Sequence, residues 1–291
     1  MHEDQSHIRF VRRGPAEVAV LRRTSSARPA SLAEGVLQGI PLAPTSAREA
    51  YEILTTVSAR LHAIGDARSV FPDIYAIVTR RVRDSLEGRT EALFWEPAFI
   101  SRLAGRFCEL YLAALRRSLE GEPERIDAWA AADRATAAPG LSPIQHAVLG
   151  LNAHINFDLA LGLLANVEAL GGEEARMERY HHDHDAVNQI LREALPEVIA
   201  LLAERHACPA SRLLLRAGRL SRPFYEASLA TLTLWRTRVW RDLEDLLAAP
   251  DAVERSRIRS RMNLRSSLFA RVFSVRCPAL AVSRPRVARL C

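Results

Sequence analysis

The sequence predicts an all-α protein, a single helical bundle domain with a buried central helix. Apolar residues recur every three or four positions over most of the chain, which is the period of one helix face. No segment alternates apolar and polar residues between hairpin turns, so strands are not expected. Residues 142–170 are apolar nearly all the way round, and a helix of that kind is buried on every side.

The elements follow in order from Ser46, which can cap the first helix. Ser142 with Pro143 favours a second clear helix start, and Gly171 with Gly172 ends that helix. The expected helices cover 46–64, 72–87, 98–119, 142–170, 173–206, 222–248 and 251–272. Residues 1–45 mix Arg, Ser, Pro and Gly with little periodicity. The expected organisation is therefore an irregular arm (1–45), a helical domain (46–250) and a basic tail (251–291).

Charge is distributed unevenly along the 291 residues. All 40 basic residues are arginine, which excludes chemistry that needs a lysine amine, such as a Schiff base or a Walker-type phosphate loop. Residues 252–291 contain ten arginines and the single acid Glu254, so the net charge of +6 resides in the tail. The tail has no Tyr or Trp for base stacking, which does not favour nucleic acid. It is suited to an acidic partner or a membrane surface, as an amphipathic helix or a disordered segment.

The cellular compartment is predicted from cysteines and hydropathy. The four cysteines lie far apart with no CxxC pair, which is typical of reduced thiols. The N-terminal residues lack the apolar stretch of a signal peptide, and no run of 18 uncharged apolar residues occurs. A cytoplasmic protein without a membrane span is expected.

Polar residues interrupt the apolar central helix. His146, Gly150, His154 and Asp158 are spaced by four, so they form a gently winding row along one face. Asn152 and Asn156 add amides on another side. Each buried polar group costs about 1–3 kcal/mol unless it is paired. Partners are therefore expected, and Gly150 leaves room beside the row.

The next helix carries a matching pair. His181 and Asp185 have the same spacing, and Asn188 extends their face at the margin of an apolar stripe. Two HxxxD units on antiparallel helices joined by a glycine turn could converge on one divalent metal, zinc or iron, with two imidazoles and two carboxylates. His154, Asp158, His181 and Asp185 are the predicted ligands. His146 would be a fifth ligand or a general base, and Asn152, Asn156 and Asn188 would support the ligands.

Simpler interpretations exist for each feature. An HxxxD pair is commonly a histidine hydrogen-bonded to a carboxylate. The run HHDHD at 181–185 fits a solvated helix start, and Asn152 and Asn156 fit core amides that bond a neighbouring backbone.

The motif NAHINFDL at 152–159 resembles the signature of an uncharacterised bacterial family of helical proteins. The resemblance extends over about 46–245 and includes Asp185, Val187 and Asn188. It implies the helical fold and a role for His154 and Asp158, and it implies no reaction. The paired HxxxD units are also similar to those of zinc-dependent phospholipases C and single-strand nucleases, which bind a metal cluster. Those enzymes have a further histidine between the units, and here no histidine lies between 154 and 181.

The sequence therefore predicts a metal-dependent enzyme, with hydrolysis of an ester or phosphoester in a small-molecule substrate favoured. His146, His154 and Asp158 are its candidate catalytic residues. A zinc-bound water would be the nucleophile. One alternative is a non-haem iron oxygenase acting on an apolar metabolite. The other is a non-catalytic interaction protein whose His/Asp network only fixes the packing.

Overall fold

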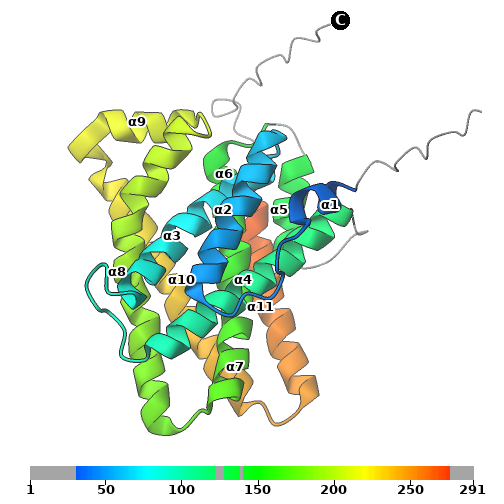
Figure 1. Cartoon of the computed structure of the whole chain (residues 1–291), viewed down its shortest axis with the longest axis vertical. Helices are drawn as coiled ribbons and strands as arrows, with labels where there is room; N and C mark the ends of the chain where they lie inside the picture. The colour runs from blue at the N-terminus through cyan, green and yellow to red at the C-terminus, as the bar shows by residue number, and fades with distance from the viewer. Residues whose placement is uncertain (1–30, 122–127, 138–139, 276–291) are drawn as a thin grey trace, which may run out of the picture. The chain divides into compact units, whose positions relative to one another are not determined.

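The computed structural model describes residues 31–121, 128–137 and 140–275, and within these ranges the chain forms helices and loops but no strand (Figure 1). The all-α prediction is confirmed. In chain order the helices are α1 (Leu32–Leu37), α2 (Ala47–Ala63), η1 (Ala67–Ser69), α3 (Val70–Leu86), α4 (Pro97–Glu120), α5 (Ala128–Ala137), α6 (Pro143–Ala153), η2 (His154–Asp158), α7 (Leu159–Leu170), α8 (Glu174–Glu204), α9 (Pro209–Ala217), η3 (Gly218–Ser221), α10 (Arg222–Ala248) and α11 (Ala252–Phe273).

Every helix that the sequence predicts is present, with ends displaced by at most two residues. The sequence pattern missed α1, α5 and α9, which are six, ten and nine residues long. Helices this short span too few turns to show a period. The first of them lies inside the expected irregular arm, where a capping box between Ser31 and Glu34 starts it and Val36 and Leu37 are buried.

The central helix is continuous from Pro143 to Leu170 and consists of α6, η2 and α7. Helices α3, α4, α5, α10 and α11 all contact it, which explains why its sequence is apolar all round (Figure 1). By length and composition it could cross a membrane, but 78% of its most apolar window is buried inside the fold. That burial is typical of the core helix of a soluble protein.

The expected basic tail includes α11, which packs into the bundle. Ile258, Met262 and Ala270 are buried on one face of α11, and the helix contacts α5, α6, η2 and α10. Leu264 and Leu268 of the same helix are at least half exposed. The helical alternative for the tail is thus correct over Ala252–Phe273, and it is a helix of the bundle.

Several arginines of α11 have partners in the bundle. Arg255 pairs with Glu168 at 2.9 Å, and Arg265 pairs with the buried carboxylate of Asp242. These ion pairs neutralise part of the positive charge from which we predicted an acidic partner or a membrane surface. The partner itself stays a prediction, and the tail beyond Val275 lies outside the described residues.

Candidate functional site

The central helix changes its hydrogen bonding where its polar row begins. Residues His154–Asp158 form a π-helical turn, in which the backbone N–H of Leu159 donates to the carbonyl of His154, five residues earlier. Single π turns inside α-helices are found frequently at functional sites. Both ends of this turn carry an ionisable side chain, and both side chains are buried, with 2% of His154 and 4% of Asp158 exposed.

His154 and Asp158 form a hydrogen-bonded dyad. The distance from Nδ1 of His154 to Oδ2 of Asp158 is 3.1 Å. The same oxygen accepts a hydrogen bond from the indole Nε1–H of Trp129 on α5, at 2.9 Å. Because a carboxylate can only accept, Nδ1 of His154 carries the proton in this arrangement. The other ring nitrogen, Nε2, is buried and has no hydrogen-bond partner.

Aromatic rings enclose the His154 imidazole. The ring stacks on Phe107 of α4, with centroids 3.4 Å apart and planes 7° apart, and Tyr75 of α3 meets it edge-on at 4.6 Å. Burial lowers the pKa of His154, although the hydrogen bond and charge of Asp158 act in the opposite direction. The imidazole is therefore neutral at pH 7, and Nε2 presents a lone pair.

Gly150 makes room for this aromatic wall. A Cβ at position 150 would lie 2.5 Å from Cδ2 and 2.9 Å from Cβ of Phe71, so no larger residue fits without moving the ring. Phe71 in turn packs edge-on against His154, with centroids 5.4 Å apart. The expectation that Gly150 leaves space beside the polar row is confirmed, and Phe71 fills part of that space.

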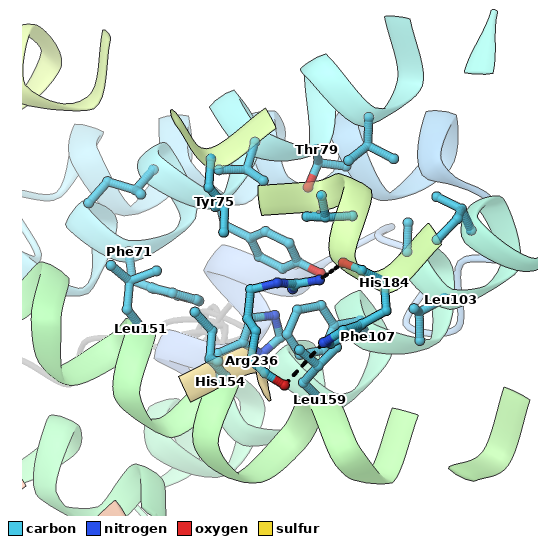
Figure 2. Close-up of a pocket in the computed structure, with 18 residues that line it drawn as sticks. Phe71, Tyr75, Thr79, Leu103, Phe107, Leu151, His154, Leu159, His184 and Arg236 are labelled. Atoms are coloured by element: carbon cyan, nitrogen blue, oxygen red, sulfur yellow. Dashed lines mark hydrogen bonds between the residues drawn. The ribbon is translucent and has the colours of Figure 1, made fainter. Parts of the chain in front are cut away.

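His154 lines a cavity of about 100 Å³ (Figure 2). Helices α3, α4, α8 and α10 and the central helix supply its walls. Most of the lining is aliphatic or aromatic, as in other small-molecule sites. The polar exceptions are His154, Tyr75, Thr79, His184 and Arg236.

His184 and Arg236 form the side of the cavity made by α8 and α10. The Arg236 guanidinium donates through Nη2 to the carbonyl of His184, and Nε2 of His184 lies 3.1 Å from the carbonyl of Arg236 (Figure 2). Burial, followed by the charge of Arg236, lowers the pKa of His184 well below its usual range, so this imidazole is neutral too. Nδ1 of His184 and Nε of Arg236 are buried without partners, and so is the Tyr75 hydroxyl.

The second predicted pair does not join the first. His181 and Asp185 lie on the outer face of α8, where their side chains are 47% and 56% exposed and 3.7 Å apart. His181 stacks on Trp240 of α10 at 4.3 Å. In the part of the chain that the structure describes, no three His, Cys, Asp or Glu side chains are placed to hold a metal together. The expected convergence of four ligands is therefore not formed, because α8 turns His184 toward the cavity and turns His181 and Asp185 outward.

The remaining predicted residues have structural partners or lie elsewhere. His146 is partly buried and lines a separate cavity of about 40 Å³ with Gly150 and Trp129, and it does not line the cavity of His154. Asn152 donates to the carbonyl of Ser266, and Asn156 donates to the side-chain oxygen of Asn152. The core-amide interpretation describes both. The side-chain oxygen of Asn188 is buried without a partner.

The HHDHD run organises the loop before α4. Asp183 is fully buried and accepts the backbone N–H groups of Trp95 and Glu96, each at 2.7 Å. His182 stacks on the Trp95 ring with centroids 3.6 Å apart. Asp183 thereby accepts hydrogen bonds from the backbone N–H groups just before Pro97, where α4 has no side-chain cap of its own. This run is therefore not a freely solvated helix start, because Asp183 and His184 are buried.

Sequence reasoning missed the site residues that lie outside the central helix. Trp129 lies on the unpredicted α5, and Arg236 is the first of three arginines in RTRVWRD (236–242), with nothing to mark it as buried. The tyrosine and phenylalanine of the cavity follow the apolar stripes of α3 and α4, where an aromatic ring looks like an ordinary core residue. Only the packing of both rings against His154 in the structure shows that they belong to the site.

The comparisons with known proteins identify a family and leave the activity open. No curated protein and no solved structure significantly resembles the chain. A family model described as a family of unknown function (DUF5995) matches residues 47–275, which include every residue of the cavity. The expectation of an uncharacterised helical family is confirmed: the chain belongs to this family of unknown function.

Proposed function

We propose that this protein binds a small, mostly apolar molecule in the cavity and that His154 acts on it as a general base. The observation that carries the proposal is the Nε2 atom of His154, a buried lone pair on the cavity wall with no partner in the protein. A general base needs its proton acceptor free, its other nitrogen held and its neutral form populated. Asp158, Trp129 and burial supply the last two conditions.

In the proposed step, a proton passes from the bound molecule to Nε2 of His154, and the electron pair stays on the molecule. The imidazolium that forms keeps its Nδ1–H bond to Asp158, whose charge stabilises it. Trp129 holds the carboxylate in position, so the dyad needs no rearrangement during the transfer. The apolar walls exclude water, which strengthens these electrostatic interactions.

The predicted metal-dependent activities have less support. The described residues offer a single HxxxD pair at the cavity, and Oδ2 of Asp158 already accepts two hydrogen bonds. This donor set does not fit the four-ligand centre, so no step is routed through a metal. The metal-dependent hydrolase and the iron oxygenase stay predictions. A purely structural network would leave Nε2 without a role, at a cost of about 1–3 kcal/mol for a buried, unsatisfied acceptor.

The size of the cavity selects the probes for a test. An engineered cavity of about 150 Å³ binds benzene, so about 100 Å³ limits the ligand to at most about six non-hydrogen atoms. Pyrrole and furan are rings of nearly equal size, and only pyrrole has an N–H to donate. We expect pyrrole to bind roughly two- to tenfold more tightly than furan, since one net hydrogen bond is worth about 0.5–1.5 kcal/mol.

The binding of both probes is measured by NMR titration of ¹⁵N-histidine-labelled protein and of the His154→Phe variant. In the wild type, pyrrole should shift the Nε2 resonance of His154, and the preference for pyrrole should vanish in the variant. His154→Phe keeps a ring on Phe107, so its binding of furan controls for an intact cavity. Equal binding of the two probes to the wild type, or an Nε2 resonance that pyrrole leaves unchanged, would refute the proposal.

A further inference from the structure

The cavity contains a cation without a counter-ion. Arg236 is 6% exposed and is the only arginine among the described residues that is classed with the buried side chains. Other poorly exposed arginines have a carboxylate at hand: Arg68 pairs with Asp66 at 2.6 Å and Arg83 with Asp84 at 2.7 Å. In the described part of the chain, no carboxylate lies within ion-pair distance of Arg236. Arg236 thus lacks the carboxylate partner that a buried charge needs and that Arg68 and Arg83 have.

The guanidinium of Arg236 has unused donors that face an apolar space. It has five N–H groups, and the hydrogen bond to the His184 carbonyl uses one of them. Its Nε atom is buried and unpartnered, as is the hydroxyl of Tyr75, and both residues line the cavity. In Figure 2 the Arg236 and Tyr75 side chains point into the same space as His154.

The charge of Arg236 persists at neutral pH. Burial lowers its pKa to about 10, and the charge of Asp185 opposes that shift. Asp185 is itself 56% exposed, so solvent screens most of its effect. A desolvated guanidinium and a phenolic O–H that line the same cavity form a fitting receptor for a carboxylate, which accepts hydrogen bonds from both.

We propose that the molecule bound in the cavity is a small monocarboxylate with a compact apolar body, and that Arg236 and Tyr75 bind its carboxylate. This inference rests on the proposed function and names its ligand class. The cavity volume limits the ligand to roughly six non-hydrogen atoms, which excludes long fatty acids. The apolar body lies against the rings and aliphatic side chains of α3 and α4, and one acid group matches the one unpaired cation.

The test compares isobutyrate with isobutyramide, which have the same shape and differ in charge. Both are titrated by NMR into wild type labelled at arginine and histidine, into Arg236→Met and into Arg238→Met. Arg238 is the matched control, because it is an arginine of the same helix that pairs with Asp242 and is 40% exposed. Methionine fills a similar volume without the charge, and pyrrole binding reports whether each variant retains an intact cavity.

Wild type and Arg238→Met should bind isobutyrate at least about tenfold more tightly than isobutyramide, with a shift of the Arg236 Nε–H resonance. Arg236→Met should lose that preference. Equal binding of acid and amide by the wild type, or a preference that survives in Arg236→Met, would overturn the inference. If pyrrole still binds in either case, the proposed general-base function stands and only the assignment of a monocarboxylate ligand is refuted. If pyrrole fails as well, both proposals fall.

Discussion

Replacing Gly150 by alanine tests the packing on which the site depends. The new Cβ would lie 2.5 Å from Cδ2 of Phe71, whereas carbon atoms pack at about 3.5–4.0 Å, so the ring has to move by roughly 1 Å. Phe71 cannot move freely, because the rings of Tyr75, Tyr111, Trp129 and His154 lie 5.1–5.7 Å from its centroid. Overpacking of this kind costs about 1–3 kcal/mol.

The helix itself partly offsets that cost. Alanine is favoured over glycine in a helix interior by about 1 kcal/mol, so Gly150→Ala should lose a net of about 0–2 kcal/mol. Gly162 provides the matched control, because it is also a buried glycine of the central helix. A Cβ there would meet Leu103 and Leu110 at ordinary distances of 3.6 and 3.7 Å. Gly162→Ala should therefore be neutral or more stable by up to about 1 kcal/mol.

The two variants are compared by urea unfolding and by thermal melting. They should differ by the overpacking cost of about 1–3 kcal/mol, which is roughly 2–12 °C in Tm for a domain of this size. Gly150→Ala should also weaken pyrrole binding, since Phe71 is part of the cavity wall. If Gly150→Ala is as stable as Gly162→Ala, the close contact with Phe71 does not exist and the described aromatic wall is wrong.

Four further predictions follow from named contacts. Trp129→Phe removes the indole donor to Asp158 and should cost about 1.5–3 kcal/mol in urea unfolding, while a loss below 0.5 kcal/mol or so would contradict the hydrogen bond. Asp183→Ala leaves the backbone N–H groups of Trp95 and Glu96 without their acceptor; at about 1–3 kcal/mol for each buried donor, a stability unchanged from wild type would show that this cap is not formed. Met262→Ala should cost about 2–5 kcal/mol, because its side chain is fully buried on the inner face of α11, and a loss of stability as small as that of a surface substitution would show that α11 is not part of the bundle. The pKa of His154 is lower in the folded chain than in the unfolded one, so the unfolded chain binds the proton first and stability should fall as pH drops below about 6.5; His154→Phe should lose less stability than wild type between pH 7 and pH 5.

A second titration concerns a cluster away from the cavity. Burial alone would raise the pKa of Asp73, but hydrogen bonds from His206 and Ser58 and the charge of Arg205 outweigh it and hold the pKa below its usual value. The carboxylate therefore stabilises the fold above about pH 4, and that contribution is lost as pH falls through the lowered pKa. Acid titration of Asp73→Asn, followed by circular dichroism, should show less dependence of stability on pH below 4 than wild type. An unchanged acid transition would contradict the assignment.

The helices could be predicted because each long one repeats its apolar residues over several turns. Ser46 and the Ser142–Pro143 pair mark helix starts at the residues where the structure begins α2 and α6. The central helix could be identified as buried because no face of it is polar enough for water. The π turn at His154–Asp158 could not be predicted, because nothing in HINFD departs from an ordinary helical sequence.

The site was predictable only in its local part. Four-residue spacing correctly paired His154 with Asp158, since both lie on one helix. On α8 the same spacing singled out His181 and Asp185, although it is His184 that faces the cavity. The apolar stripe beginning at Val187 fixes the inward direction of a helix only to within about one residue, or 100°. Contacts with α3, α4 and α10 along the length of α8 decide between such neighbours, and these contacts join residues far apart in sequence.

The central claim is that His154 is a neutral imidazole with its proton on Nδ1 and a free lone pair on Nε2. It is tested most directly by ¹⁵N NMR of histidine-labelled protein between pH 5 and pH 8, with and without pyrrole. The account predicts an Nδ1–H tautomer that stays neutral below the ordinary imidazole pKa of about 6.5, with an Nε2 resonance that moves when pyrrole is added. An Nε2–H tautomer, or a titration at the ordinary value, would contradict it.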